Sequence, residues 1–519
     1  MGIDRSLDKN FLRNMLIQLK FKMKPRFATL FPVGLLVLLI LADIKCSLAG
    51  ELSVYPPLPD NQYRSDIFEV TVSQAGESRS SYVYKSVRNV DNTQVKSPVF
   101  TTDANHWTSF SFSGAVTVQV KIRDGTAINS AVIRPLAKNI RAEVRNNTVS
   151  FTLTNPANMF VELDAKPRDA LFIFANPAET DIPARTTPNT IYFGPGVTDL
   201  GKEPISISEG QTVYLAGGAY VKGRLQIAGQ GGGKTVTIRG RGVLSGIDIP
   251  GTKGLFSQFM IGAAKKTALD LNVEGIVITD SHGISLLAPK RLTAENVKIL
   301  AWLGQTDGIA GGKQSLVKDC FLKVNDDCLH FHQTGIKLLN NVIWRQNSGS
   351  ALQMGWNVTQ DVDGELCDGL DIIGDDMGRT HLARDWANAD VVALIDIHQH
   401  ASYKNIVIQN VRHEKKAYQL FGVRTMLVPE DKFHDSYRDG RGSVEGMTIR
   451  NITAAELPLH PSVFDGNGRE PGSIANVTFE NLQVGSNSVT TANATNYVVQ
   501  RGKTSGFRFI SPADSASSK

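Results

Sequence analysis

The chain has 519 residues, which is long enough for more than one domain, and its formal net charge is +5. Hydrophobic residues make up 41% of it, so a large core can form and a wholly disordered chain is excluded. Aromatic residues are few, at 8%, and no long block of one charge suggests a nucleic-acid-binding tail.

Residues 1–49 read as a secretory signal peptide. A basic stretch that ends at Arg26 precedes an apolar run over residues 31–42, and Ser47-Leu48-Ala49 resembles a cleavage site. The apolar run is short for a membrane span, so we expect a secreted protein, extracellular or periplasmic, with no stable span after cleavage. Cleavage would remove eight Lys or Arg and three Asp or Glu and leave 47 basic and 47 acidic residues. Because the mature chain then has no net positive charge, we expect no nucleic acid as a partner. A retained anchor is the alternative, because the run is strongly apolar.

Residues 50–190 carry short segments in which apolar and polar residues alternate, separated by turns rich in Gly, Asn and Pro. The segments lie at residues 68–72, 82–84, 110–112, 116–120, 142–144, 149–153 and 171–174. About seven such strands predict an N-terminal β-sandwich domain. It holds no catalytic constellation, and we expect it to pack on the following domain.

Residues 191–519 show a different pattern, a β-rich segment that returns about every 20 to 25 residues in the central part. The segments start at Val213, Val236, Ile276, Val297, Cys320, Val342, Leu370, Ile406, Met447 and Val477. This period predicts a parallel β-helix, a solenoid in which each turn buries its apolar edge on its neighbours. A leucine-rich repeat has a similar period but requires a recurrent leucine ladder, and these segments are rich in Val, Ile and Thr. The fold class we expect is therefore all-β, with loops inserted between the later coils.

A second strand in the central coils locates a group of acids. Its aliphatic positions are Ile284, Ile309, Leu329 and Leu352. Two residues before each of them stand His282, Asp307, Asp327 and Ser350, which we expect to stack as a column with neighbours about 4.8 Å apart. Asp326 lies beside Asp327 on the same turn.

Three carboxyls this close cannot all ionise freely. Their mutual repulsion raises the proton affinity of at least one, which gives a general acid beside a general base. A single Asp at a solenoid turn is usually structural, because its side chain bonds to nearby backbone. Stacked like charges cost stability, so their presence indicates a function, and an acid with a base suits glycoside hydrolysis.

We expect neither a metal nor another cofactor. Cys320, Cys328 and Cys367 are too few for a disulfide framework and predict buried thiols or at most one bridge. His398 and His400 alternate on a predicted strand but have no third ligand nearby in the sequence, which makes a weak metal site.

The motifs around the acids resemble those of a known family. Gln305-Thr306-Asp307-Gly308, Val324-Asn325-Asp326-Asp327 and Gln353-Met354-Gly355-Trp356 are similar to the core motifs of glycoside hydrolase family 49, the dextranases and isopullulanases, as is the segment 214–223 upstream. The resemblance implies an inverting enzyme with a β-sandwich and a right-handed β-helix. It also implies that Asp326 is the general acid and that Asp307 and Asp327 hold the attacking water.

Several further residues are candidates for substrate binding. They are Gln353, Trp356, His330, His332, Trp302 and Gln305. The two histidines alternate with Leu329 and Phe331, so both should face away from the core, where they serve a cleft or are simply solvated. The two tryptophans either stack on a sugar ring or cap the apolar core. A polar loop over residues 379–386 is a cleft wall or a solvated loop.

We predict a monomeric enzyme that cleaves a neutral α-glucan such as dextran (α-1,6) or pullulan. A polygalacturonase-like pectin hydrolase is the closest alternative, but its Gly-His-Gly and Arg-Ile-Lys motifs are absent here, and a uronate needs cationic partners. A non-catalytic polysaccharide-binding β-helix would not need the three acids. A lyase would need a Lys or Arg base beside calcium-binding acids.

Overall fold

A computed structural model gives the structure of the chain, and its described residues begin at Gly50. They are 50–86, 104–229, 233–249, 259–263, 269–288, 290–304, 306–346, 348–355, 358, 360–376, 393–398, 401–425, 442–466 and 473–511. Residues from Glu51 onward form one compact unit. Short 3-10 turns occur at η1 (Pro59–Asn61), η2 (Leu136–Lys138) and η5 (Ala494–Asn496).

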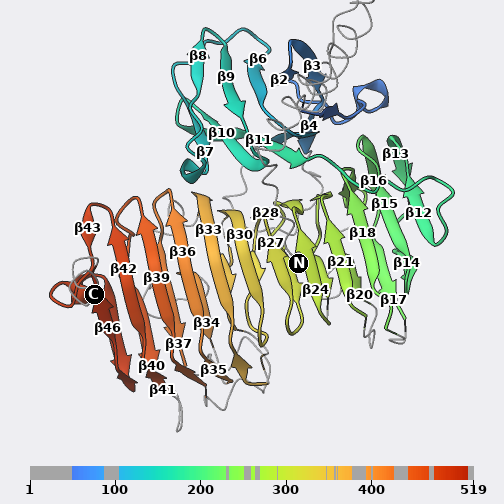
Figure 1. Ribbon diagram of the computed structural model, residues 1–519. Coiled ribbons are helices and arrows are strands. Elements are labelled where there is room, and N and C mark those ends of the chain that lie inside the picture. Colours follow the sequence, from blue (N-terminus) through green and yellow to red (C-terminus); the bar gives the residue numbers. More distant parts are fainter. Residues whose placement is uncertain are drawn as a thin grey trace, which may run out of the picture. The chain divides into compact units, whose positions relative to one another are not determined.

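The N-terminal part is a sandwich of two sheets (Figure 1). The first sheet contains β1 (Leu52–Val54), β4 (Val83–Ser86), β5 (Asn105–Phe112), β7 (Ala131–Arg134), β10 (Ala157–Leu163) and β11 (Lys166–Pro177). The second contains β2 (Phe68–Gln74), β3 (Glu77–Ser81), β6 (Val116–Ile122), β8 (Glu143–Arg145) and β9 (Thr148–Leu153). Alternate residues of β2, β6 and β9 point inward, and Val72, Val118 and Val149 are fully buried between the sheets.

The rest of the chain winds into a parallel β-helix (Figure 1). The longest sheet begins with β12 (Thr190–Phe193), β13 (Gly196–Asp199), β15 (Thr212–Leu215), β16 (Ala219–Lys222), β18 (Val236–Gly240), β19 (Val243–Ser245), β21 (Leu271–Glu274), β22 (Val277–Thr279), β24 (Leu292–Glu295) and β25 (Lys298–Leu300). It continues with β27 (Leu316–Lys318), β28 (Phe321–Val324), β30 (Lys337–Arg345), β33 (Leu366–Asp375), β36 (Val407–His413), β39 (Thr448–Ala454), β42 (Thr478–Val484), β43 (Asn487–Ser488) and β46 (Arg508–Ile510).

Two further sheets complete the coils, the second of them only in the later coils. One contains β14 (Ile205–Ser208), β17 (Leu225–Ala228), β20 (Phe259–Ala263), β23 (Ile284–Ala288), β26 (Ile309–Gly311), β29 (Leu329–His330), β31 (Leu352–Gln353), β34 (Ala393–His398), β37 (Gln419–Arg424), β40 (Ser462–Gly466) and β44 (Val498–Gly502). The other contains β32 (Val362–Asp363), β35 (Ser402–Lys404), β38 (Ser443–Glu445), β41 (Ser473–Ala475) and β45 (Thr504–Ser505). The expected fold class, an all-β chain with a sandwich and a β-helix, is confirmed.

The longest sheet turns a sharp corner in every coil, and Asn serves most often at that corner. Asn296, Asn340, Asn410, Asn451 and Asn481 all have a left-handed backbone there, with φ between 52° and 57°. Asn tolerates this conformation better than most residues, since its short polar side chain bonds locally. The amides also bond from coil to coil: Asn481 Nδ2 donates to Asn451 Oδ1, and Asn451 Nδ2 donates to Asn410 Oδ1, each at 3.1 Å. The corner residues therefore hold the coils in register.

The corner also explains an error in the predicted repeat. The ten segments fall on two different columns of the longest sheet: Val213 pairs with Ile238 on one side of the corner, whereas Ile278 pairs with Ile299 on the other. Each coil contributes an apolar strand on both sides of the corner, and periodicity alone does not tell the two apart. The coil from Leu366 to Val407 is consequently longer than the sequence spacing indicated.

The sandwich packs on the β-helix through a shared apolar cluster. Trp107 and Phe172 from the sandwich join Phe321, Trp344 and others from the outer face of the longest sheet. Buried ion pairs flank this cluster: Arg134 bonds both to Glu162 at 2.7 Å within the sandwich and to Glu414 at 2.8 Å on the β-helix. The sandwich is thus anchored on the coils, as the sequence predicted.

Lys323 brings this contact close to the predicted acids. Its Nζ donates to Asn105 Oδ1 of the sandwich at 2.5 Å and lies 4.3 Å from the ring centre of Trp344. Lys323 is the third residue before Asp326, so the sandwich braces the strand that leads into the acid turn.

Among the described residues, no helix is both long enough and apolar enough to cross a membrane.

Candidate active site

The predicted acids lie where strands of the longest sheet pass to the shorter sheet of β26, β29 and β31. Ile309 pairs with Leu329, and Leu329 pairs with Leu352. Main-chain bonds extend this register backward, because Gly308 N donates to the carbonyl of Asp327 and Cys328 N donates to that of Ser350, each at 2.8 Å. Asp307, Asp327 and Ser350 therefore occupy equivalent positions in three successive coils.

His282 does not belong to this column, which corrects the prediction. Ile309 pairs with Leu286 and not with Ile284, so the position opposite Asp307 is held by Ile284. The strand β23 is longer than the later ones, and its residues 284, 286 and 288 are all buried. Ile284 and Leu286 are both aliphatic, and the prediction aligned Ile284 with Ile309 where the structure pairs Leu286.

Hydrogen bonds hold the acids in place. Ser350 donates to Asp327 Oδ1 twice, from its backbone N–H at 2.8 Å and from its hydroxyl at 2.9 Å. Asp326 Oδ1 accepts the backbone N–H of Asp327 at 3.0 Å. Asp307 Oδ2 lies 3.0 Å from Nε2 of His330 on the next coil. Asp327 is thus paired with a hydroxyl, Asp326 with a backbone amide and Asp307 with an imidazole.

The surroundings of Asp326 and Asp327 raise the proton affinities of these two carboxyls. Burial, and then the charges of Asp307 and Asp327, raises the pKa of Asp326 well above its usual range. Burial and the charge of Asp307 raise the pKa of Asp327 to about 7, although His330 and the bonds from Ser350 act in the opposite sense. The cluster titrates as a coupled set and retains a proton near neutral pH.

The two histidines of this strand have opposite electrostatic environments. Burial tends to lower the pKa of His330, but its hydrogen bond to Asp307 and the nearby carboxylates outweigh burial and raise the pKa. Burial and the neighbouring His330 lower the pKa of His332 to about 3. His332 is therefore neutral, and its Nδ1 lies 3.0 Å from Oε1 of Gln353 on the next coil. The surroundings of His330 thus favour its protonated form, whereas His332 lies against the amide of Gln353.

The turns that carry the acids are tied to each other. Asn325 Nδ2 donates to the carbonyl of Trp302 at 2.9 Å, and Asn325 N donates to Thr306 Oγ1 at 3.3 Å. The Thr306 hydroxyl in turn donates to the carbonyl of Leu303 at 2.7 Å. Thr306 and Asn325 are buried, so the motif residues beside the acids serve to fix the two turns. The Trp302 side chain is partly exposed.

Sequence reasoning missed a buried charged group next to the acid turn. Arg345 pairs in register with Val324 and has no exposed side-chain surface. It bonds to both oxygens of Asp375 and to the carbonyl of Ala393, and Nε2 of His413 lies 3.0 Å from the same carboxylate. Burial raises the pKa of Asp375, but Arg345 and His413 reverse this effect and hold it below the usual value. This ionic group stiffens the coils beside Asp326.

Some predicted residues lie outside the described part of the chain. They are Gln305, Trp356, the polar loop 379–386 and His400. Their roles remain predictions. The side chain of His398 is likewise outside the described residues, and in the described part no group of three or more His, Cys, Asp or Glu is arranged to hold a metal ion.

The three described cysteines are free thiols buried in the core of the β-helix. Of the two predicted outcomes, buried thiols and one bridge, the structure has the first.

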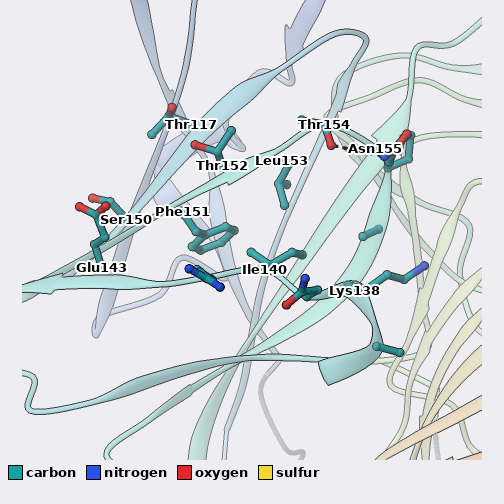
Figure 2. A pocket seen from close by; sticks show the side chains of 15 residues that line it. Thr117, Lys138, Ile140, Glu143, Ser150, Phe151, Thr152, Leu153, Thr154 and Asn155 are labelled. Atoms are coloured by element: carbon teal, nitrogen blue, oxygen red, sulfur yellow. Dashed lines mark hydrogen bonds between the residues drawn. The ribbon is translucent and has the colours of Figure 1, made fainter.

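A cavity of about 770 Å³ lies elsewhere, on the sandwich (Figure 2). It is lined by the end of β9 and by the segment around Ile140, with Lys138 and Glu143 at its edges (Figure 2). It contains one acidic side chain and none of the residues of the acid column, so its size does not make it the candidate active site.

Comparisons with known proteins agree with this geometry. Residues 49–160 match the N-terminal Ig-like domain of glycosyl hydrolase family 49. The chain is 24% identical to an isopullulanase of Aspergillus niger over 86% of this chain and 90% of that protein. It is 24% identical to a dextranase of Arthrobacter globiformis over 58% of this chain and 62% of that protein.

A solved structure shows the same fold. Dex49A from Penicillium minioluteum superposes with a TM-score of 0.66 over 88% of this chain and 96% of its own, at 18% identity. The fold and the relatives define a hydrolase that acts on glycosidic bonds and is built on a parallel β-helix. The resemblance to glycoside hydrolase family 49, the dextranases and isopullulanases, is confirmed.

The raised pKa of Asp326 predicts a stability effect that depends on pH. A carboxyl whose pKa is higher in the folded state than in the unfolded state does not change the free energy of unfolding at a pH where it is protonated in both states. It destabilises the folded state as the pH rises from the unfolded pKa to the folded pKa. Asp326→Asn should therefore raise the free energy of unfolding at pH 7 by about 0.5–2 kcal/mol and change it little below about pH 4. Urea denaturation at several pH values measures this.

Asp181→Asn, at an exposed Asp, is the matched control and should show no such trend. A variant at Asp326 that is equally or less stable than the parent at pH 7 would contradict the account of the acid cluster.

Proposed function

We propose that this protein is an inverting glycoside hydrolase that cleaves a neutral α-glucan such as dextran or pullulan. Asp326 is the general acid that protonates the departing glycosidic oxygen. Asp307 and Asp327 are the bases that hold and deprotonate the attacking water. The observation that carries the proposal is the stacking of Asp307 and Asp327 in register with Asp326 beside them.

The electrostatics of the cluster support these roles. A general acid must keep its proton at the working pH, and the pKa of Asp326 is raised well above the usual range. A base must be ionised, and although burial and Asp307 raise the pKa of Asp327 to about 7, His330 and the two bonds from Ser350 act against this rise and favour its ionised form. The fold thus places the general acid, Asp326, and the base, Asp327, in different electrostatic surroundings.

The substrate class rests on the relatives and on the charge of the site. The similar proteins are named isopullulanase and dextranase, which points to a glucan. Arg345, which pairs in register with Val324 before the acid turn, is buried and bonds to Asp375 inside the coil, so its charge is not available to a uronate. The neutral imidazole of His332, which is partly exposed and lies 3.0 Å from the buried amide of Gln353, suits a sugar hydroxyl.

Export through removal of residues 1–49 fits an enzyme whose substrate is a polysaccharide outside the cell. We propose that the exported chain starts near Gly50 and acts as a monomer. N-terminal sequencing and size-exclusion chromatography check these two points.

The proposed activity is tested with purified residues 50–519 on dextran, pullulan and polygalacturonate in parallel. Reducing sugar should be released from dextran or pullulan and not from polygalacturonate. Asp326→Asn should lower turnover about 10²- to 10⁴-fold, because a general acid contributes that much, while binding of the polymer survives. Equal activity of Asp326→Asn, or release from polygalacturonate alone, would overturn the proposal.

The charge of His330 predicts a shift in the pH dependence. Because His330 lowers the pKa of Asp327, His330→Gln should raise that pKa. The base is then ionised only at higher pH, so the acidic limb of the profile of kcat/KM moves to higher pH. The matched control is His332→Gln on the same strand: His332 is neutral, and its loss should reduce the rate without moving the limb. The reverse pattern, or no shift in either variant, contradicts the assignment of Asp327.

A further inference from the structure

The register that aligns the acids continues along the same corner of the β-helix. Leu352 pairs with Ile395, Ala393 with Gln419, Gly422 with Val463, and Ser462 with Val498. In these coils the position of Asp327 is taken successively by Ser350, Ala393, Gln419, His460 and Asn496. His460 N donates to the carbonyl of Tyr418 and Ser462 N donates to that of Tyr497, at 3.0 and 2.8 Å, as this register requires.

A small cavity opens at the far end of this row. Its volume is about 150 Å³, and both His460 and Asn496 line it. With coils spaced about 4.8 Å apart, His460 lies four coils from Asp327, at a distance of about 19 Å. The cavity is thus in line with the acids but several sugar units away from them.

The chemistry of the cavity suits a neutral sugar. Its lining residues are Leu420, Leu457, Pro458, Leu459, His460, Pro461, Ser462, Leu482, Val484, Asn496 and Tyr497, and no charged side chain is among them. The partly exposed ring of Tyr497 and the side chain of Leu457, which is 59% exposed, can cover the apolar face of a pyranose ring. An amide at Asn496 and an imidazole at His460 provide donors and acceptors for hydroxyls.

His460 is neutral under ordinary conditions. Its ring packs 4.7 Å from that of Tyr418, and burial lowers its pKa. A neutral imidazole both donates and accepts one hydrogen bond, as a sugar hydroxyl needs, and it does not attract an anion.

We propose that this cavity is a distal subsite for a neutral glucan chain whose scissile bond lies at Asp326. The proposal rests on the function proposed above and extends it: the enzyme binds long chains better than short ones, because only a chain that spans four coils reaches His460 from the acids, and Tyr497 lies one coil further. The exposed side chain of Leu457, which lies beside polar groups, then contacts the apolar face of the sugar.

The test compares one polymer, dextran or pullulan, whichever the parent enzyme cleaves, with a short oligosaccharide of the same linkage. Tyr497→Ala and His460→Gln should raise KM for the polymer about 3- to 10-fold, which corresponds to the loss of one ring or polar contact. Their kcat on the polymer and their kcat/KM on the short substrate should stay unchanged. Leu457→Ala should raise the KM for the polymer in the same way, and Ile182→Ala, which removes an apolar side chain that is equally exposed at 59% but lies far along the sequence, is its matched control.

Thermal melting shows that each variant is folded, and His460→Gln retains most of the side-chain volume if Tyr497→Ala is unstable. An unchanged polymer KM in both variants overturns the subsite, as does an equal loss on short and long substrates. A parent enzyme that cleaves neither polymer overturns the proposed function instead, together with the subsite that rests on it.

Discussion

The constraint on which this protein depends is the register between successive coils of the β-helix. Parallel strands spaced about 4.8 Å apart place equivalent residues directly above each other. An apolar residue at such a position becomes part of a continuous core, as Leu329 and Leu352 do. An acid at such a position meets another acid, and Asp307 above Asp327 is the result.

Stacked acids oppose folding, and the protein offsets their repulsion with neighbours on each side. The imidazole of His330 lies 3.0 Å from the carboxylate of Asp307, and Ser350 gives two hydrogen bonds to Asp327. Outside the acids, Arg345 and Asp375 form a buried ion pair in the adjoining coils, and the sandwich braces Lys323. What remains is a strongly raised pKa at Asp326, where burial and the two neighbouring carboxylates outweigh the hydrogen bond from the backbone of Asp327. Asp326, whose burial and repulsion are offset least by its neighbours, is the acid that the proposed mechanism keeps protonated.

The sequence carried enough information for the fold class and for the central column, because aliphatic spacing reports the period directly. Asp307, Asp327 and Ser350 were aligned correctly since their strands are short and offer one aliphatic register. His282 was misaligned because β23 is longer and offers two. The two sides of the corner were also merged, since apolar strands occur on both.

Other features had no signal that single-sequence reasoning could use. Arg345 stands at an inward position of a strand, where alternation predicts an apolar residue, and its partner Asp375 comes 30 residues later in the sequence. The far cavity depends on the register of His460 and Asn496, which inserted loops hide from any fixed period. The family resemblance rested on the acid motifs of the β-helix, and the similarity of the sandwich to the family's Ig-like domain adds support from a separate part of the chain.

The central claim, water held by two bases opposite a protonated Asp326, is tested most directly by the stereochemistry of the product. Proton NMR of the first sugar released from an α-glucan distinguishes the two anomers before they interconvert. A single displacement by water predicts the β-anomer from an α-linked substrate. The α-anomer as the first product would mean that one of these carboxylates attacks the sugar itself, and would contradict the account.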